Sequence, residues 1–182
     1  MKYQSGTFLT ANNLEYRIRE VQATDAALLN SFLQMMVRDS EYLEFEADDF
    51  NHSRDEEEKI IRECADAKNC LMLLAENNQQ IIGYAGIRVS TQGIMPYVGV
   101  FGIAVHKEYQ HQGIGSGLMN EVLGWARESS GLKKIILAVF EDNINAIKLY
   151  ESAGFRKEGV LEKSYIINGR PHQQIIMGMD IS

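Results

Sequence analysis

Val98-Gly99-Val100-Phe101-Gly102-Ile103-Ala104-Val105, followed shortly by Gln110-His111-Gln112-Gly113-Ile114-Gly115, is the stretch that decides the fold. The first part is apolar and predicts a buried strand. After Gly115, apolar residues recur at helical spacing: Leu118, Met119, Val122, Leu123, Trp125 and Ala126. The sequence therefore predicts a strand, a glycine-bearing turn and a helix N-terminus in succession.

Such a turn is suited to binding an anion. The first N–H groups of a helix have no intrahelical acceptor, and the helix dipole adds about half a positive charge there. Gly113 and Gly115 lack a Cβ, so a phosphate could approach the main chain closely. A plain strand-to-helix connection explains the same residues equally well. The motif Gly-x-x-x-x-Gly-Lys-Ser/Thr is absent, and the glycine spacing differs from Gly-x-Gly-x-x-Gly.

Length and composition indicate one globular domain over residues 1–182. Hydrophobic residues make up 45% of the chain and charged residues 24%, which are ordinary globular values. The net charge of −7 argues against nucleic-acid and anionic-membrane partners, since both need basic surfaces. The N-terminus lacks the apolar core of a signal peptide, and we expect a cytoplasmic protein.

Cys64 and Cys70 are the two cysteines of the chain. They form no Cys-x-x-Cys pair and have no histidine at ligand spacing, so we expect neither a disulfide framework nor a zinc site. Both are predicted to be buried or half-buried thiols, and no metal is expected.

The remaining elements follow from periodicity and turn signals. Residues 1–13 are expected to be a loose lead-in, and Thr24 and Asp25 to cap the first helix. Gly99 and Gly102 inside a strand indicate a bulge or a close backbone approach. The predicted strands are 14–21, 71–75, 81–89, 96–105, 134–140, 160–167 and 172–181, and the predicted helices begin near residues 26, 53, 114 and 144. Asn168-Gly169 predicts a type I′ turn between the last two strands.

An acidic segment runs from Asp39 to Asp49 and contains Glu44 and Glu46 among aromatic residues. It is interpreted either as a surface that recruits a cation or as a solvated connection.

Asn143, Ala146, Ile147 and Tyr150 fall at i, i+3, i+4 and i+7 and therefore share one helix face. This helix follows the strand 134–140, which we expect to pair in parallel with the strand before Gln110. A ligand between the two strands could touch both the glycine turn and this face. Alternatively, Tyr150 is a core aromatic residue and Asn143 a plain helix cap.

Together the two motifs resemble those of the GNAT superfamily of acetyl-CoA-dependent N-acetyltransferases. Gln110-x-x-Gly113-x-Gly115 is similar to the pyrophosphate-binding motif of that family, and Asn143 to Phe155 is similar to its closing helix. The resemblance implies an α+β fold with a mixed, largely antiparallel sheet of about seven strands, flanked by helices, with one parallel pair splayed at the cofactor site.

The resemblance also implies roles for individual residues. Tyr150 would act as general acid toward the coenzyme A thiolate, and Asn143 would contact the cofactor near its thiol end. Main-chain groups of the strand would meet the pantetheine arm, and those of the turn the pyrophosphate. The expected cofactor-binding residues are Ile103, Ala104, Val105, Gln110, His111, Gln112, Gly113, Ile114, Gly115, Ser116, Asn143 and Tyr150.

The two motifs do not identify the general base or the acceptor. Many relatives carry a carboxylate on the central strand, where this chain has Val98 to Phe101. Glu44 and Glu46 are the expected substitutes, with His106 as a further option, and direct attack is expected because neither cysteine lies in a motif. The acidic balance favours a small cationic amine such as a polyamine. The alternatives are acetylation of a protein N-terminus or an amino-sugar, or a coenzyme A sensor without turnover. The resemblance also suggests a homodimer.

Overall fold

The computed structural model describes residues 3–39, 53–89, 97–129, 131–167 and 170–181. The elements in chain order are β1 (Gly6–Leu9), β2 (Glu15–Glu20), the 3-10 turn η1 (Ala23–Asp25), α1 (Ala26–Asp39), α2 (Arg54–Asp66), β3 (Leu71–Asn77), β4 (Gln80–Val89), β5 (Val98–Val105), the 3-10 turn η3 (Lys107–Tyr109), α3 (Ile114–Ser129), β6 (Lys134–Phe140), α4 (Ile144–Ala153), β7 (Arg156–Ile167) and β8 (Arg170–Asp180).

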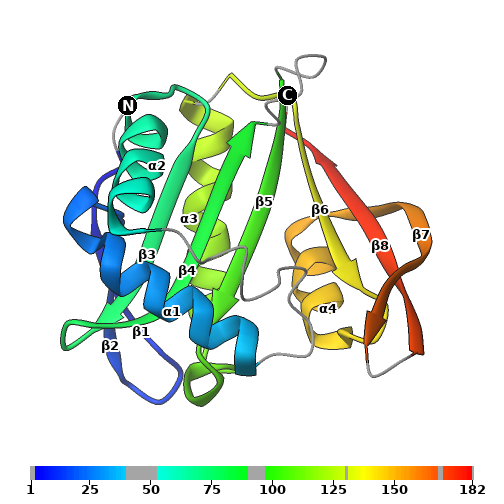
Figure 1. Ribbon diagram of the computed structural model, residues 1–182, viewed down its shortest axis with the longest axis horizontal. Helices are drawn as coiled ribbons and strands as arrows, with labels where there is room; N and C mark the ends of the chain where they lie inside the picture. Colours follow the sequence, from blue (N-terminus) through cyan, green and yellow to red (C-terminus); the bar gives the residue numbers. More distant parts are fainter. Residues whose placement is uncertain (1–2, 40–52, 90–96, 130, 168–169, 182) are drawn as a thin grey trace.

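The strands form one sheet in the order β1-β2-β3-β4-β5-β6-β8-β7 (Figure 1). All neighbouring strands are antiparallel except β5 and β6, which confirms the mixed, largely antiparallel sheet. The sheet has eight strands rather than about seven. The additional strand is β1, so the expectation of a loose segment over residues 1–13 was wrong: Phe8 of β1 stacks on Tyr16 of β2, and the Tyr3 hydroxyl donates to the Glu121 carboxylate at 2.8 Å.

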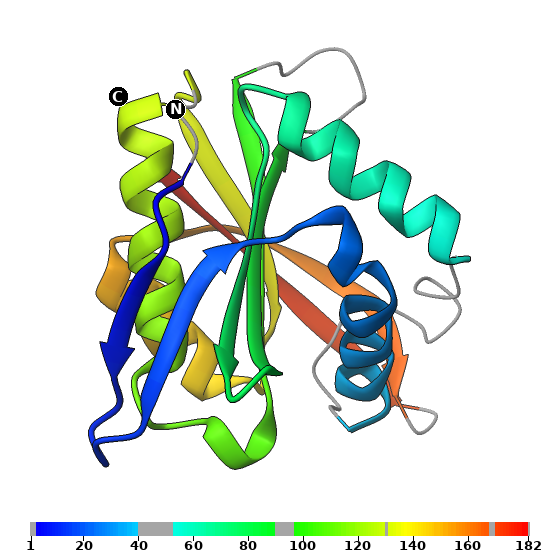
Figure 2. The ribbon, with the colours of Figure 1, turned by 90° about the vertical axis from the view of Figure 1, so that its left-hand side faces the viewer.

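Helices cover both faces of the sheet. α1 and α2 lie on one face, and α3 and α4 lie on the other (Figures 1 and 2). Each face has its own hydrophobic core: α1 and α2 pack over Met72 and Leu74, whereas α3 and α4 pack over Leu73 and Phe101. Successive residues of a strand therefore point into different cores.

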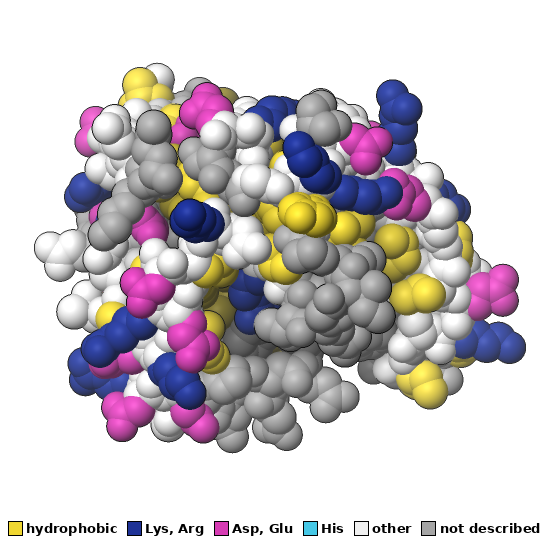
Figure 3. Space-filling view, turned by 90° about the horizontal axis from the view of Figure 1, so that it is seen from above, with side chains coloured by type: hydrophobic (Ala, Val, Ile, Leu, Met, Phe, Trp, Pro, Cys, Tyr) yellow, Lys and Arg dark blue, Asp and Glu magenta, His cyan; other side chains and the backbone are white. Residues whose placement is uncertain are grey.

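Helix α2 has a charged outer surface and a buried stripe. Its N-cap is Ser53, whose side chain accepts from the Glu56 N–H, and the Glu56 carboxylate accepts from the Ser53 N–H at 2.8 Å. The outer surface carries the ion pairs Arg54–Glu58, Lys59–Glu63 and Arg62–Glu58, where acidic and basic side chains gather (Figure 3). The buried residues are Glu57, Ile61 and Cys64.

The cysteines were predicted wrongly. Cys64 and Cys70 form a disulfide that joins the last turn of α2 to the residue before β3, with a Cα–Cα distance of 5.1 Å. The prediction of two thiols failed because the chain turns back between Cys64 and Cys70 and brings the two residues together. The spacing of six residues alone did not show this turn.

The start of α1 also differs from prediction. Thr24 and Asp25 lie in η1 rather than acting as the cap of α1. The Asp25 carboxylate accepts from the Gln22 N–H at 2.8 Å and pairs with Arg19 at 2.6 Å. The turn predicted at Asn168-Gly169 lies outside the described residues, although β7 and β8 pair as the hairpin requires. None of the helices described is both long and apolar enough to cross a membrane.

Candidate active site

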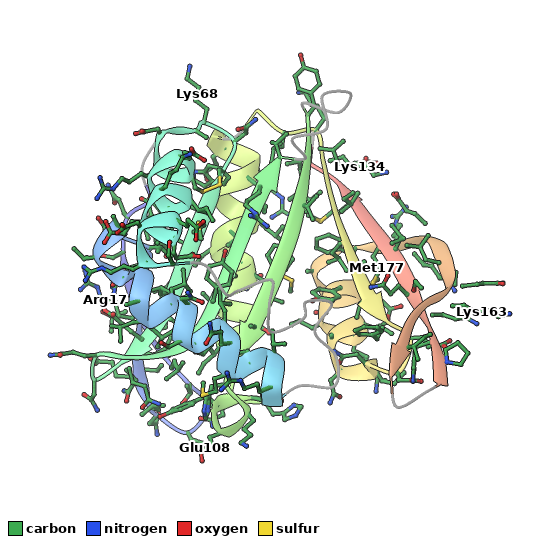
Figure 4. The ribbon with its side chains drawn as sticks, viewed as in Figure 1. Arg17, Lys68, Glu108, Lys134, Lys163 and Met177 are labelled. Atoms are coloured by element: carbon green, nitrogen blue, oxygen red, sulfur yellow. A yellow bond between two sulfur atoms is a disulfide. The ribbon has the colours of Figure 1, made fainter. Side chains whose placement is uncertain are left out.

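The parallel strands β5 and β6 pair over three positions and then diverge. Val98, Gly99 and Val100 lie opposite Lys134, Ile135 and Ile136, and in the described part of the chain no β6 partner follows Val100. The divergence opens from the start of β6, where Lys134 lies, toward the end of the molecule that carries Glu108 (Figure 4). An extended ligand can hydrogen-bond to such a free strand edge.

The two interior glycines of β5, Gly99 and Gly102, have different surroundings. The register with β4 runs without a shift from Gly99 to Val105, so the bulge that these glycines suggested is not present. A Cβ at Gly99 would lie 2.8 Å from both Ile87 and Leu132, which confirms a close approach there. At Gly102 a Cβ would meet no heavy atom of the described chain segments within 4 Å.

The turn between β5 and α3 is shaped by two residues with positive φ, His111 at 59° and Gly113 at 89°. The described residues leave the space beside Gly113 open, since none of them lies within 4 Å of a Cβ placed there. Gly117 donates to the Gly113 carbonyl at 2.9 Å, so the N–H groups of Ile114, Gly115 and Ser116 precede this first bond of α3. The geometry fits an anionic group such as a pyrophosphate.

Side chains of the turn between β5 and α3 stabilise its conformation by hydrogen bonds to the main chain. Gln110 donates its amide to the Val105 carbonyl at 3.0 Å, and Gln112 donates to the Glu108 carbonyl at 2.9 Å. Ile114 is completely buried. These three residues therefore offer a ligand their main-chain groups rather than free side chains.

Helix α4 brings Tyr150 to the divergence of the strands. The Tyr150 ring packs against Phe101 of β5 and Phe155, with centroid distances of 6.3 and 5.9 Å, and Tyr150 is 7% exposed. Asn143 caps the helix by accepting from the Ala146 N–H at 3.2 Å, as predicted. Gly154, at a φ of 103°, ends it.

The other face of β5 belongs to the side covered by α1 and α2. Ala104 packs there with Tyr84, whereas Ile103 and Val105 pack toward α3 and α4. The three predicted strand residues are therefore split between two faces. Glu44 and Glu46 lie outside the described residues.

Three candidate site residues on the face that α1 and α2 cover were not singled out from the sequence: Glu57, Tyr84 and Arg88. Burial raises the pKa of the Tyr84 hydroxyl to about 12, with the charge of Arg88 opposing the rise and that of Glu57 adding to it. Glu57 is only 4% exposed. Its spacing of four and seven residues from Ile61 and Cys64 places it on a buried helix face, and that was the signal available in the sequence. The described part of the chain contains no group of three or more His, Cys, Asp or Glu side chains that could hold a metal.

A comparison with family models matches residues 35–155 to the Acetyltransferase (GNAT) family. The chain belongs to the GNAT family. A crystal structure of a GNAT-family acetyltransferase from Streptococcus pneumoniae is 30% identical, with a TM-score of 0.86, and the match covers 91% of this chain and 99% of that one. The resemblance drawn from the two motifs, and the fold that it implied, are confirmed.

Curated relatives in the family differ in their named acceptors. The L-amino acid N-acetyltransferase AaaT of Escherichia coli is 32% identical over 105 residues, which cover 58% of this chain and 65% of that protein. The spermidine N(1)-acetyltransferase of Vibrio cholerae is 39% identical over 70 residues, which cover 38% of this chain and 40% of that protein. The matches thus span less than two thirds of the length of these GNAT relatives.

Proposed function

We propose that this chain transfers the acetyl group of acetyl-CoA to a primary amine. The observation that carries the proposal is a juxtaposition: the free edge of β5, the open turn before α3 and the Tyr150 ring meet where β5 and β6 diverge. The family of the chain supports the same reaction class.

The residues divide the work between backbone and side chains. The N–H groups of Ile114, Gly115 and Ser116, beside the open space at Gly113, would hold the pyrophosphate. The free edge of β5, at Ile103 to Val105, would hydrogen-bond to the pantetheine arm. The remaining residues of the predicted cofactor-binding set are Gln110, His111, Gln112, Asn143 and Tyr150. Acetyl-CoA supplies the activated acetyl thioester when it is bound.

Tyr150 is proposed to act as general acid. The amine nitrogen attacks the thioester carbonyl carbon, the C–N bond forms and the C–S bond breaks. Phenols and thiols in general have comparable basicities, so the Tyr150 hydroxyl is suited to giving its proton to the departing thiolate. Direct attack is favoured over an acyl-enzyme because both cysteines are joined in the disulfide and no thiol is available.

The acceptor must lose a proton before it attacks, because an alkylammonium with a pKa near 10.4 is almost wholly charged at pH 7. Glu44 and Glu46 remain the predicted bases. The prediction of a polyamine acceptor rests on the same segment, 39–49, and is the alternative that the acceptor panel tests against amino acids. Among the described residues, Glu57 is a buried carboxylate on the face of the sheet that α1 and α2 cover.

The test is thiol release from acetyl-CoA across a panel of amino acids, polyamines, amino-sugars and basic peptides, with mass spectrometry of the product. We expect release that depends on at least one amine, with that amine gaining one acetyl group. Binding of coenzyme A without release for any amine would instead support the sensor alternative.

Two further predictions concern the whole protein. Gel filtration with light scattering tests the predicted homodimer, for which the edge strand β7 offers the exposed residues Val160, Leu161 and Ile166. The predicted cytoplasmic location meets a physical objection in the disulfide, because disulfides persist mainly in oxidising compartments. The oxidation state of Cys64 and Cys70 in freshly lysed cells would test it.

A further inference from the structure

Two glycines face each other on the sheet surface that α1 and α2 cover. Gly86 of β4 lies opposite Gly102 of β5. Among the described residues, nothing lies within 4 Å of a Cβ placed at Gly102, so they leave the space above it open. A Cβ at Gly86 would lie 2.8 Å from the Tyr84 hydroxyl oxygen, which shows that this hydroxyl already lies over Gly86. The open space at Gly102 therefore has a phenol hydroxyl beside it.

The next pair along the same face is Arg88 and Val100. Both are exposed, Val100 by 43%. They share the face of Gly86 and Gly102 because residues two apart on a strand point the same way. Arg88 forms no ion pair with another described residue. We call the set Tyr84, Gly86, Arg88, Val100 and Gly102 the acceptor floor.

A negative charge lies close to the same hydroxyl. Glu57 reaches inward from the first turn of α2 and is buried. The charges of both Glu57 and Arg88 influence the pKa of Tyr84, the first raising it and the second lowering it, after the larger effect of burial. An acidic and a basic side chain thus both act on one hydroxyl group.

The acceptor floor adjoins the proposed reaction centre. Val100 is the last β5 residue that pairs with β6, and Gly102 follows it by two positions. Between them, Phe101 points to the opposite face and packs on Tyr150. A molecule above Gly102 would therefore lie across β5 from the proposed general acid.

We infer that the acceptor floor binds a zwitterion, a small molecule such as an α-amino acid that carries a carboxylate close to its primary amine. The inference rests on the proposed function and names its substrate class. The Arg88 guanidinium would bind the carboxylate through two parallel N–H bonds, and Glu57 would face the ammonium group. A polyamine would bring only positive charge to Arg88, and like charges repel.

The experiment compares each L-amino acid with its own carboxamide as acceptor, alongside spermidine, in thiol-release assays at saturating acetyl-CoA. The amide keeps the amine and the side chain but loses the negative charge. We expect kcat/KM for the acid to exceed that for the amide about tenfold or more, because a hydrogen-bonded charge pair contributes that much.

Arg88→Gln should remove this preference, mainly by raising KM for the acid, and Arg88→Lys should keep part of it. The matched control is Arg17→Gln, which neutralises an exposed arginine on β2 at the far side of the sheet (Figure 4). Arg17→Gln should preserve the preference in full.

Equal rates for acid and amide, a preference unchanged in Arg88→Gln, or a preference for spermidine over every amino acid would each overturn the inference while leaving acetyl transfer in place. Absence of thiol release with every amine would refute the proposed function itself.

Discussion

The two faces of β5 serve the proposed site by different physical means. On the α3 side, main-chain groups dominate: the N–H groups of α3 and the edge of β5, with Gly113 open beside them. On the α1 and α2 side, the proposed acceptor site uses three side chains from two elements, α2 and β4: Glu57, Tyr84 and Arg88. A backbone site tolerates most changes of side chain, whereas a side-chain site can change its specificity by single substitutions. Under the proposed function, this contrast would let one fold hold one cofactor and accept different amines.

The largest expected effect is on the chemical step. Tyr150→Phe keeps the ring that packs on Phe101 but removes the proton, so we expect kcat to fall by about 100-fold or more. KM for acetyl-CoA should change little, and initial rates over both substrates measure this. A kcat within threefold of the wild-type value would remove Tyr150 from the mechanism.

The next largest effect is expected from a substitution that fills the open space on the α1 and α2 face of β5. Gly102→Leu places a side chain above the acceptor floor, so we expect KM for the amine to rise about tenfold while KM for acetyl-CoA stays within about twofold. If both constants rise together, the two faces are not separate sites. Thermal unfolding serves as the control for folding.

The counterpart is Gly113→Ala, which adds a Cβ to the turn and disfavours its φ of 89°. Here KM for acetyl-CoA should rise several-fold and KM for the amine should not. The strain should lower the free energy of unfolding by about 1 kcal/mol. A variant with unchanged cofactor binding, measured by calorimetry, would contradict the proposed pyrophosphate site.

A stability effect should follow from the disulfide under the acceptor side. The double variant Cys64→Ser, Cys70→Ser should lose about 2 kcal/mol of unfolding free energy, because the crosslink restricts the unfolded chain. Urea unfolding measures the loss, and reduction of the wild type should reproduce it. Equal stability of reduced and oxidised protein would count against the crosslink as a stabilising element.

The smallest effect concerns pH. Burial alone would raise the pKa of Asp25, but hydrogen bonds from Arg19 and from the Gln22 N–H outweigh it and lower that pKa. The stabilisation is therefore present above the unfolded pKa of about 3.9 and is lost as the pH falls through the folded value. Asp25→Asn should be less stable than wild type by roughly 1 kcal/mol at pH 7, with the gap closing at lower pH. A gap that stays constant to pH 2 would contradict this.

The sequence predicted the strands and helices around the proposed cofactor site because their determinants are local. The run from Val98 to Gly115 and the face from Asn143 to Tyr150 each lie within one strand-turn-helix segment, where period and glycine spacing are informative. The acceptor floor depends on the register that sets Gly86 against Gly102, and the disulfide on how α2 returns to β3. Both depend on tertiary structure, which local sequence patterns do not predict. β1 was missed because a short edge strand has little apolar periodicity.

A crystal structure of the chain with coenzyme A and an L-amino acid tests the two-faced site most directly. We expect phosphate oxygens within hydrogen-bond distance of the N–H groups of Ile114 to Ser116. We also expect the amino acid above Gly102 with its carboxylate on Arg88. Coenzyme A bound away from the α3 turn, or both ligands on the same face of β5, would contradict the two-faced site.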